Sequence, residues 1–176
     1  EQEGTQARQT VPAPAQTLAI LLNPRNADQK LPTWRDFYHS EEELAEAVAA
    51  AYRQGFSDLY DAGCRCIQID DCALPILCDA QKVVKWGLDV HRLSELYVYT
   101  NNASLRDKPS DLTVTTHLCR GNYRSHYATG GAYDTIAPSA FAHENVDGFY
   151  LEYDDERSGS FEALKFIPKD KRVVLG

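Results

Sequence analysis

The strongest constraint on the fold is the alternation of strand and helix patterns along the chain. Short apolar stretches typical of strands occur at 64–70, 112–119, 147–153 and 172–175, and helical patterns separate most of them. Strands that alternate with helices at this spacing are typical of βαβ units, whose right-handed crossovers build a parallel sheet. The sequence therefore predicts an α/β fold.

The helical patterns have recognisable boundaries. Ser40 is placed to cap a helix, Glu43 to reach back to the cap's amide, and Gly63 to end the helix. Before this helix a strand is expected between Gln9 and Leu22, with residues 18–22 as the most apolar candidate. Further helices or helical turns are expected at 79–96 (one or two helices), 133–143 and 161–166.

Alternate residues of a strand point to opposite faces, which separates two kinds of side chain. In 112–119 one row is largely apolar, whereas the other ends in His117 and Cys119. The stretches 64–70 and 147–153 repeat this asymmetry. One apolar face, with polar chemistry at the carboxyl ends of the strands, is typical of a (β/α)8 TIM-type barrel, whose active sites lie at that mouth.

Such a barrel needs about 250 residues, whereas this chain has 176 residues and at most five strand units. We therefore expect an incomplete barrel, with a flexible N-terminal segment at 1–10 and a partial barrel domain at 11–176. Strand edges left exposed would favour self-association. The sequence contains no Met, so we expect it to be a processed product or a segment of a longer chain.

Composition narrows the partners and the compartment. The net charge of −8, without clusters of Lys and Arg, argues against nucleic acid and anionic membranes as partners. No apolar run is long enough to span a bilayer, and residues 1–10 do not resemble a signal peptide. Four of the five cysteines fall within fifteen positions, unlike a secreted disulfide framework, which favours a cytoplasmic location.

A candidate metal site lies at the strand ends. His117 and Cys119 are two residues apart on one strand, so an imidazole and a thiolate converge as two ligands of a tetrahedral zinc ion would. Glu152, near the end of the next strand, is a third candidate. The same residues also fit a buried cysteine beside a hydrogen-bonded histidine, and Glu152 fits a solvated acidic loop. Asp70 could hold a substrate ammonium or cap a helix.

Three motifs in order resemble the cobalamin-independent methionine synthase family, most closely its single-barrel, catalytic-domain-like members. They are Ile-Gln-Ile-Asp-Asp at 67–71, His-Leu-Cys-Arg-Gly-Asn at 117–122 and Leu-Glu-Tyr-Asp at 151–154. Residues 60–63 and 173–176 are also similar, and the likeness extends from about residue 11 to residue 176. Three motifs in this order are far more specific than any one of them.

The resemblance implies that zinc is bound by His117, Cys119 and Glu152, with a second cysteine farther along the chain, and that Asp70 contacts the amino group of homocysteine. No catalytic residue is implied beyond the metal site. The implied reaction moves a methyl group from methyltetrahydrofolate, or from another methyl donor, to the homocysteine thiol, giving methionine. Coordination to zinc makes a thiolate available at neutral pH.

Two departures from the family pattern leave other functions open. The family's second cysteine would lie beyond residue 176, and residues 13–15 read Ala-Pro-Ala where relatives typically carry serines around the proline. A degenerate relative acting as a structural or interaction protein is one alternative. Another is a different barrel enzyme of the wider superfamily, such as a uroporphyrinogen decarboxylase-like protein, which would not need these three ligands.

Overall fold

The computed structural model describes residue 4 and residues 6–23 and 31–176. Within them, one parallel sheet of five strands runs in sequence order, and each strand pairs with the next. This confirms the predicted α/β class. The strands are β1 Gln9–Pro12, β2 Cys66–Asp71, β3 Thr113–Leu118, β4 Gly148–Leu151 and β5 Arg172–Leu175.

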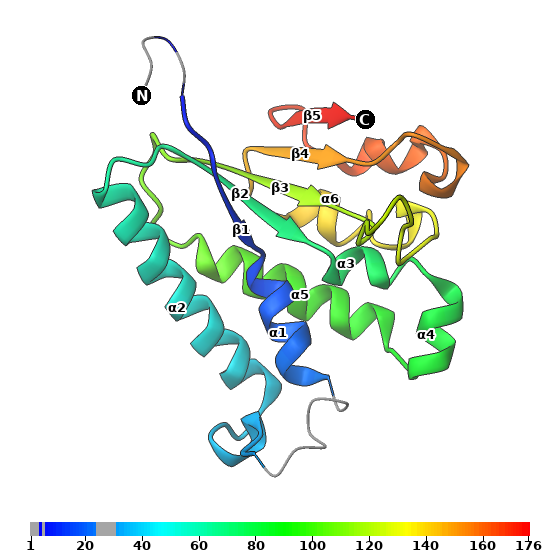
Figure 1. The fold of residues 1–176 in the computed structure, drawn as a ribbon, viewed down its shortest axis with the longest axis horizontal. Coiled ribbons are helices and arrows are strands. Elements are labelled where there is room, and N and C mark those ends of the chain that lie inside the picture. The colour runs from blue at the N-terminus through cyan, green and yellow to red at the C-terminus, as the bar shows by residue number, and fades with distance from the viewer. Residues whose placement is uncertain (1–3, 5, 24–30) are drawn as a thin grey trace.

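Helices pack against one face of this sheet, and Figure 1 shows α1, α2 and α5 together on that side. Within the described residues, short 3-10 helices accompany them at 34–36, 133–135, 156–158 and 161–166. The α-helices are α1 Pro14–Leu22, α2 Glu41–Asp61, α3 Ala73–Ile76, α4 Ala80–Trp86, α5 Val90–Ser104 and α6 Ala140–His143.

The predicted separation of the two strand faces is confirmed. Val114, Thr116 and Leu118 of β3 are fully buried under the helices, whereas His117 and Cys119 of the other row are half-buried. The same alternation holds in the neighbouring strands, whose helix-facing residues Ile67, Ile69, Phe149 and Leu151 are buried. The apolar rows therefore form the core, and the polar rows line an open face.

A strand lies between Gln9 and Leu22, as predicted, but its most apolar candidate, residues 18–22, is wrong, because these residues belong to α1. The strand in this region is β1, which ends at Pro12. Pro14 occupies the first turn of α1, where its fixed φ suits a helix and its missing N–H is not needed. A short apolar run does not distinguish a buried strand from a buried helix.

The other helix predictions are confirmed with two changes. Ser40 Oγ caps α2 by accepting from the amide of Glu43, but the Glu43 carboxylate accepts from the amide of His39 rather than from that of Ser40. The helix expected at 133–143 is split into a 3-10 turn and α6, because Pro138 lies between them and disfavours helix at the preceding residue. The pattern at 79–96 forms two helices, α4 and α5.

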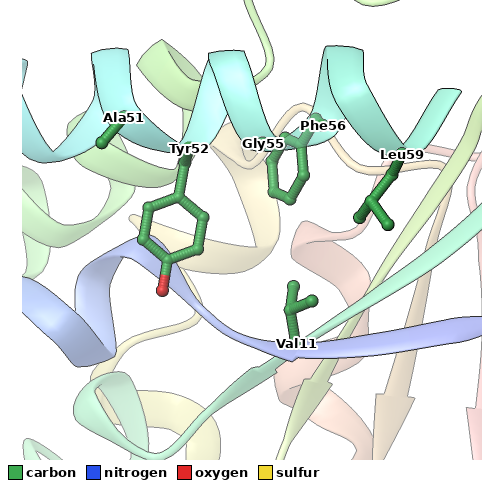
Figure 2. A pocket seen from close by; sticks show the side chains of 6 residues that line it. All are labelled: Val11, Ala51, Tyr52, Gly55, Phe56 and Leu59. Carbon is green, nitrogen blue, oxygen red and sulfur yellow. The ribbon is translucent and has the colours of Figure 1, made fainter. Parts of the chain in front are cut away.

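An apolar groove of about 390 Å³ follows the outer strand β1. Figure 2 shows the Val11 side chain of β1 pointing toward α2, where Ala51, Gly55, Phe56 and Leu59 face it. The other outer strand, β5, exposes its side chains, including Val174. The described residues thus form an open sheet, and both barrel closure and self-association stay predictions.

Two further features concern the ends and the surface of the molecule. The flexible segment expected at 1–10 falls partly on residues 1–3 and 5, which lie outside the described residues, and β1 begins within it at Gln9. Among the described residues, no helix has the length and apolar character needed to cross a membrane.

Candidate metal centre

The open face carries a row of polar side chains across three adjacent strands. Asp70 of β2 is in register with His117 of β3, and His117 is in register with Tyr150 of β4. In parallel strands, residues in register point to the same face. The sheet therefore places these three side chains side by side near its carboxyl edge, as the sequence predicted for Asp70 and His117.

His117 is oriented by a backbone group and faces a carboxylate. Its Nδ1 lies 3.3 Å from the carbonyl oxygen of Tyr150, and its Nε2 lies 3.9 Å from Glu152 Oε1. When Nδ1–H donates to that carbonyl, Nε2 keeps its lone pair. A ring held in this way is the usual arrangement for a histidine that ligates a metal.

Glu152 is held at the end of β4 by contacts on both its backbone and its side chain. Its amide donates to the hydroxyl of Tyr133 at 3.2 Å, and its Oε1 accepts from the side-chain amide of Asn122. Its Oε2 is buried and has no hydrogen-bond partner in the described part of the chain, although the Arg157 guanidinium lies 3.6 Å away. A buried carboxylate oxygen without a hydrogen bond is a candidate ligand atom.

Cys119, the third predicted ligand, forms a disulfide with Cys72. The sequence analysis did not identify this partner. Asp71 is in register with Leu118, so Cys72 and Cys119 are the next pair along the two strands, just beyond their ends. Register was the signal that could have found it. In the described residues no group of three His, Cys, Asp or Glu side chains is assembled as a metal site.

The residues present nevertheless fit zinc by their chemistry. An imidazole nitrogen, a carboxylate oxygen and a cysteine sulfur are all ligands that zinc accepts. The observation that favours the fit is Glu152, whose Oε1 lies 3.9 Å from Nε2 of the oriented His117 and whose buried Oε2 has no hydrogen-bond partner among the described residues.

The two consecutive aspartates at the end of β2 have different environments. Asp70 is half-buried on the open face, where its Oδ1 accepts from Gln68 Nε2 at 2.8 Å. Asp71 is fully buried on the helix side, where its Oδ1 accepts from the amides of Ala73 and Leu74 at the start of α3. Capping therefore describes Asp71, whereas Asp70 stays available to a ligand.

Behind the sheet, Asp71 belongs to a buried network centred on Asn101 of α5. The Asn101 side-chain amide donates to Asp71 Oδ2 at 3.0 Å and to Glu144 Oε1 at 2.7 Å, and its oxygen accepts from the amide of Ala15 at 2.9 Å. Burial raises the pKa of Asp71. Burial, with the nearby Asp71 charge, raises the pKa of Glu144 to about 8.

A second cavity on the open face, of about 390 Å³, lies toward the amino-terminal ends of the strands. Cys66, Thr113, Gly148 and Arg172, each the first residue of its strand, line it. It does not include the candidate ligands. The polar groups that could perform chemistry are therefore at the opposite edge of the sheet from this cavity.

Comparison with known proteins identifies similar chains of greater length. The chain is 40% identical over 146 residues to the uncharacterized protein YxjH of Bacillus subtilis, and 37% identical over 147 residues to the uncharacterized protein YxjG of the same organism. Each match covers 81% of this chain and 39% of the relative. The chain thus spans about two fifths of the length of these curated relatives. No protein-family model matches the chain.

A solved structure shows a similar fold. The chain is 32% identical to a candidate vitamin-B12-independent methionine synthase from Listeria monocytogenes, with a TM-score of 0.70. The match covers 99% of this chain and 46% of the Listeria protein. The fold of the described chain, an α/β structure with a five-stranded parallel sheet, is therefore that of part of the Listeria protein.

Proposed function

We propose that this chain carries part of a zinc-dependent methyltransferase site, which moves a methyl group from a methylfolate-type donor to the thiol of homocysteine to give methionine. The observation that supports this most is the pairing of His117 Nε2 with Glu152 Oε1 at 3.9 Å at the carboxyl edge of a parallel sheet, with Cys119 two residues after His117 in the sequence. The likeness to the Listeria protein supports the same reaction class.

In this proposal the sheet belongs to a (β/α)8 barrel, of which residues 11–176 form a part. Barrel enzymes build their active sites at the carboxyl ends of the strands. The candidate ligands lie at that edge, on β3 and directly after β3 and β4. The remaining strands would come from chain outside the 176 residues, in keeping with the longer relatives.

Each residue has a distinct role. His117, Cys119 and Glu152 would hold the ion, and zinc would favour the thiolate form of a bound homocysteine. The Tyr150 carbonyl fixes the His117 ring, and the Tyr133 hydroxyl fixes the start of the Glu152 segment. Asp70, in register with His117, would bind the homocysteine ammonium and so aim its sulfur toward the ligand cluster.

The methyl donor in this proposal is a methylated tertiary amine. The homocysteine sulfur forms a bond to the methyl carbon while the carbon–nitrogen bond breaks, and its electron pair goes to the donor nitrogen. The thiol proton is released, and a proton is taken up by the nitrogen. The chain's own residues would orient the homocysteine, and the zinc that they hold would favour its thiolate form.

The assignment of Asp70 gives the sharpest test of substrate recognition. Asp70→Ala should weaken homocysteine binding at least about tenfold, because a charge-assisted hydrogen bond is lost, and should leave zinc stoichiometry unchanged. Calorimetric titration of homocysteine into the reduced, zinc-loaded protein measures the first quantity, and metal analysis measures the second. Glu162→Ala, which removes an exposed carboxylate elsewhere, is the matched control. Equal losses of zinc and homocysteine would contradict the assignment.

A further inference from the structure

The disulfide between Cys72 and Cys119 links the two loops that follow β2 and β3. Their Cα atoms are 5.4 Å apart, within the usual range for disulfides. The backbones are joined at the same point, because the amide of Cys119 donates to the carbonyl of Asp71 at 3.2 Å. Two adjacent parallel strands thus bring the two cysteines close to each other.

The other cysteines provide a contrast within the same chain. Cys64, Cys66 and Cys78 are free. Cys64 and Cys66 are half-buried, as Cys72 and Cys119 are, but the Cys64 thiol donates to the carbonyl of Cys66 instead of bonding to another sulfur. Exposure alone therefore does not select the pair; the register of β2 and β3 does.

We propose that Cys72 is a redox partner of Cys119, and that their reversible disulfide removes a ligand from the candidate metal centre. This inference rests on the proposed function only for its effect on zinc. A sulfur in a disulfide is not a thiolate, and zinc binds the thiolate. In the oxidised protein only His117 and Glu152 remain of the three ligands, so the site is open to metal only when the pair is reduced.

The oxidant is a low-molecular-weight disulfide such as oxidised glutathione. One cysteine thiolate attacks it, forms a mixed disulfide and releases one small thiol. The second cysteine then attacks the protein sulfur of the mixed disulfide, forms the Cys72–Cys119 bond and releases the second small thiol. The protein loses two hydrogens, and the oxidant gains them. An excess of reduced thiol or a phosphine reverses the reaction.

Metal binding and disulfide formation compete for one sulfur, so each should suppress the other. Loss of a metal's outer-shell partner alone weakens binding by about 10–100-fold, and loss of a ligand should weaken it by at least about 100-fold. By the same linkage, saturating zinc should slow formation of the disulfide.

The first measurement detects the bond itself. The phosphine-reduced protein is treated with oxidised glutathione, and its intact mass and alkylated peptides are then analysed. We expect a mass lower by two hydrogens and a crosslinked peptide pair containing Cys72 and Cys119. Cys64→Ser, which removes a half-buried free thiol, should form the same bond, and Cys72→Ser should not. The proposal would be overturned if the wild type does not form this bond. It would also be overturned if Cys72→Ser forms a disulfide between other cysteines under the same conditions.

The second measurement titrates zinc with a chelating dye as competitor. The reduced wild type and reduced Cys72→Ser should bind zinc alike, the oxidised wild type should bind at least about 100-fold more weakly, and Cys72→Ser should resist the oxidant. Equal zinc binding by the oxidised and reduced wild type would show that the disulfide does not control metal binding. Loss of zinc in reduced Cys72→Ser would also overturn the proposal, because Cys72 would then be a ligand. Absence of zinc from the reduced wild type would overturn the metal site, and with it the control of metal binding by the disulfide, while the mass measurement decides the bond independently.

Discussion

The carboxylates on the two faces of the sheet differ in burial and in their hydrogen-bond partners. On the helix-covered face, Asp71 and Glu144 are fully buried, bridged by Asn101, and have raised pKa values. On the open face, Asp70 and Glu152 are only partly buried, and Glu152 Oε1 lies 3.9 Å from His117 Nε2. Asp70 and Asp71 are consecutive residues of one strand, β2, and the alternation along the strand places them on opposite faces. The covered carboxylates therefore belong to the packing of the fold, and ligand binding is proposed only for the open face.

The largest expected difference between the faces comes from Asn101. Asn101→Leu should lower the free energy of unfolding by about 3 kcal/mol or more, because Ala15, Asp71 and Glu144 each lose a buried hydrogen bond at about 1–3 kcal/mol apiece. Asp70→Asn, on the open face, should change it by less than about 1 kcal/mol. Urea denaturation followed by circular dichroism measures both. Similar losses in the two variants would break the distinction between the faces.

The next effect is a pH dependence that belongs to the covered face. The pKa of Glu144 rises from 4.5 to about 8 on folding, so the folded protein holds a proton that the unfolded chain releases. Its stabilising effect is complete below pH 4.5 and is lost as the pH rises to about 8. Denaturation midpoints between pH 5 and pH 8 should therefore fall with pH in the wild type and should stay much flatter in Glu144→Gln. An equally steep fall in the variant would exclude Glu144 as the source.

A smaller effect is expected where the two faces meet, at Tyr133. Its buried hydroxyl donates to the carbonyl of Leu118 at 2.8 Å and accepts from the amide of Glu152. Tyr133→Phe should cost about 1–2 kcal/mol of stability and weaken zinc binding about tenfold, because Glu152 loses its support. Denaturation and zinc competition measure the two changes. Tyr123→Phe, at an exposed ring, is the control, and zinc binding that matches the control would separate Tyr133 from the metal site.

Much of the sheet could be predicted from the sequence, because alternation along a strand records which face is buried. The rows of 112–119 and 147–153 therefore gave the correct faces for His117 and Glu152. The parallel order followed from the intervening helices. The assignment of residues 18–22 as a strand failed, because an apolar run of this length fits either a strand or a helix. Only the position of Pro14, in the first turn of α1, distinguishes the two.

The candidate site was predictable only in part, because it depends on register between strands. His117 and Asp70 share a face by alternation, but their direct opposition is set by backbone pairing between β2 and β3. The same pairing brings Cys72 to Cys119, and neither a motif nor local spacing indicates it. The Asn101 network likewise joins residues separated by 30 to 86 positions. Tertiary packing, rather than local pattern, creates these contacts.

The claim that the open face holds a metal centre can be tested most directly by the zinc content of the reduced protein. The purified chain is reduced with a phosphine, equilibrated with zinc, freed of excess metal and analysed for zinc per chain. We predict stoichiometric zinc in the wild type and in Glu144→Gln, and substantial loss in His117→Ala, Cys119→Ser and Glu152→Gln. Zinc that is absent from the wild type, or that remains in all three ligand variants, would contradict the account.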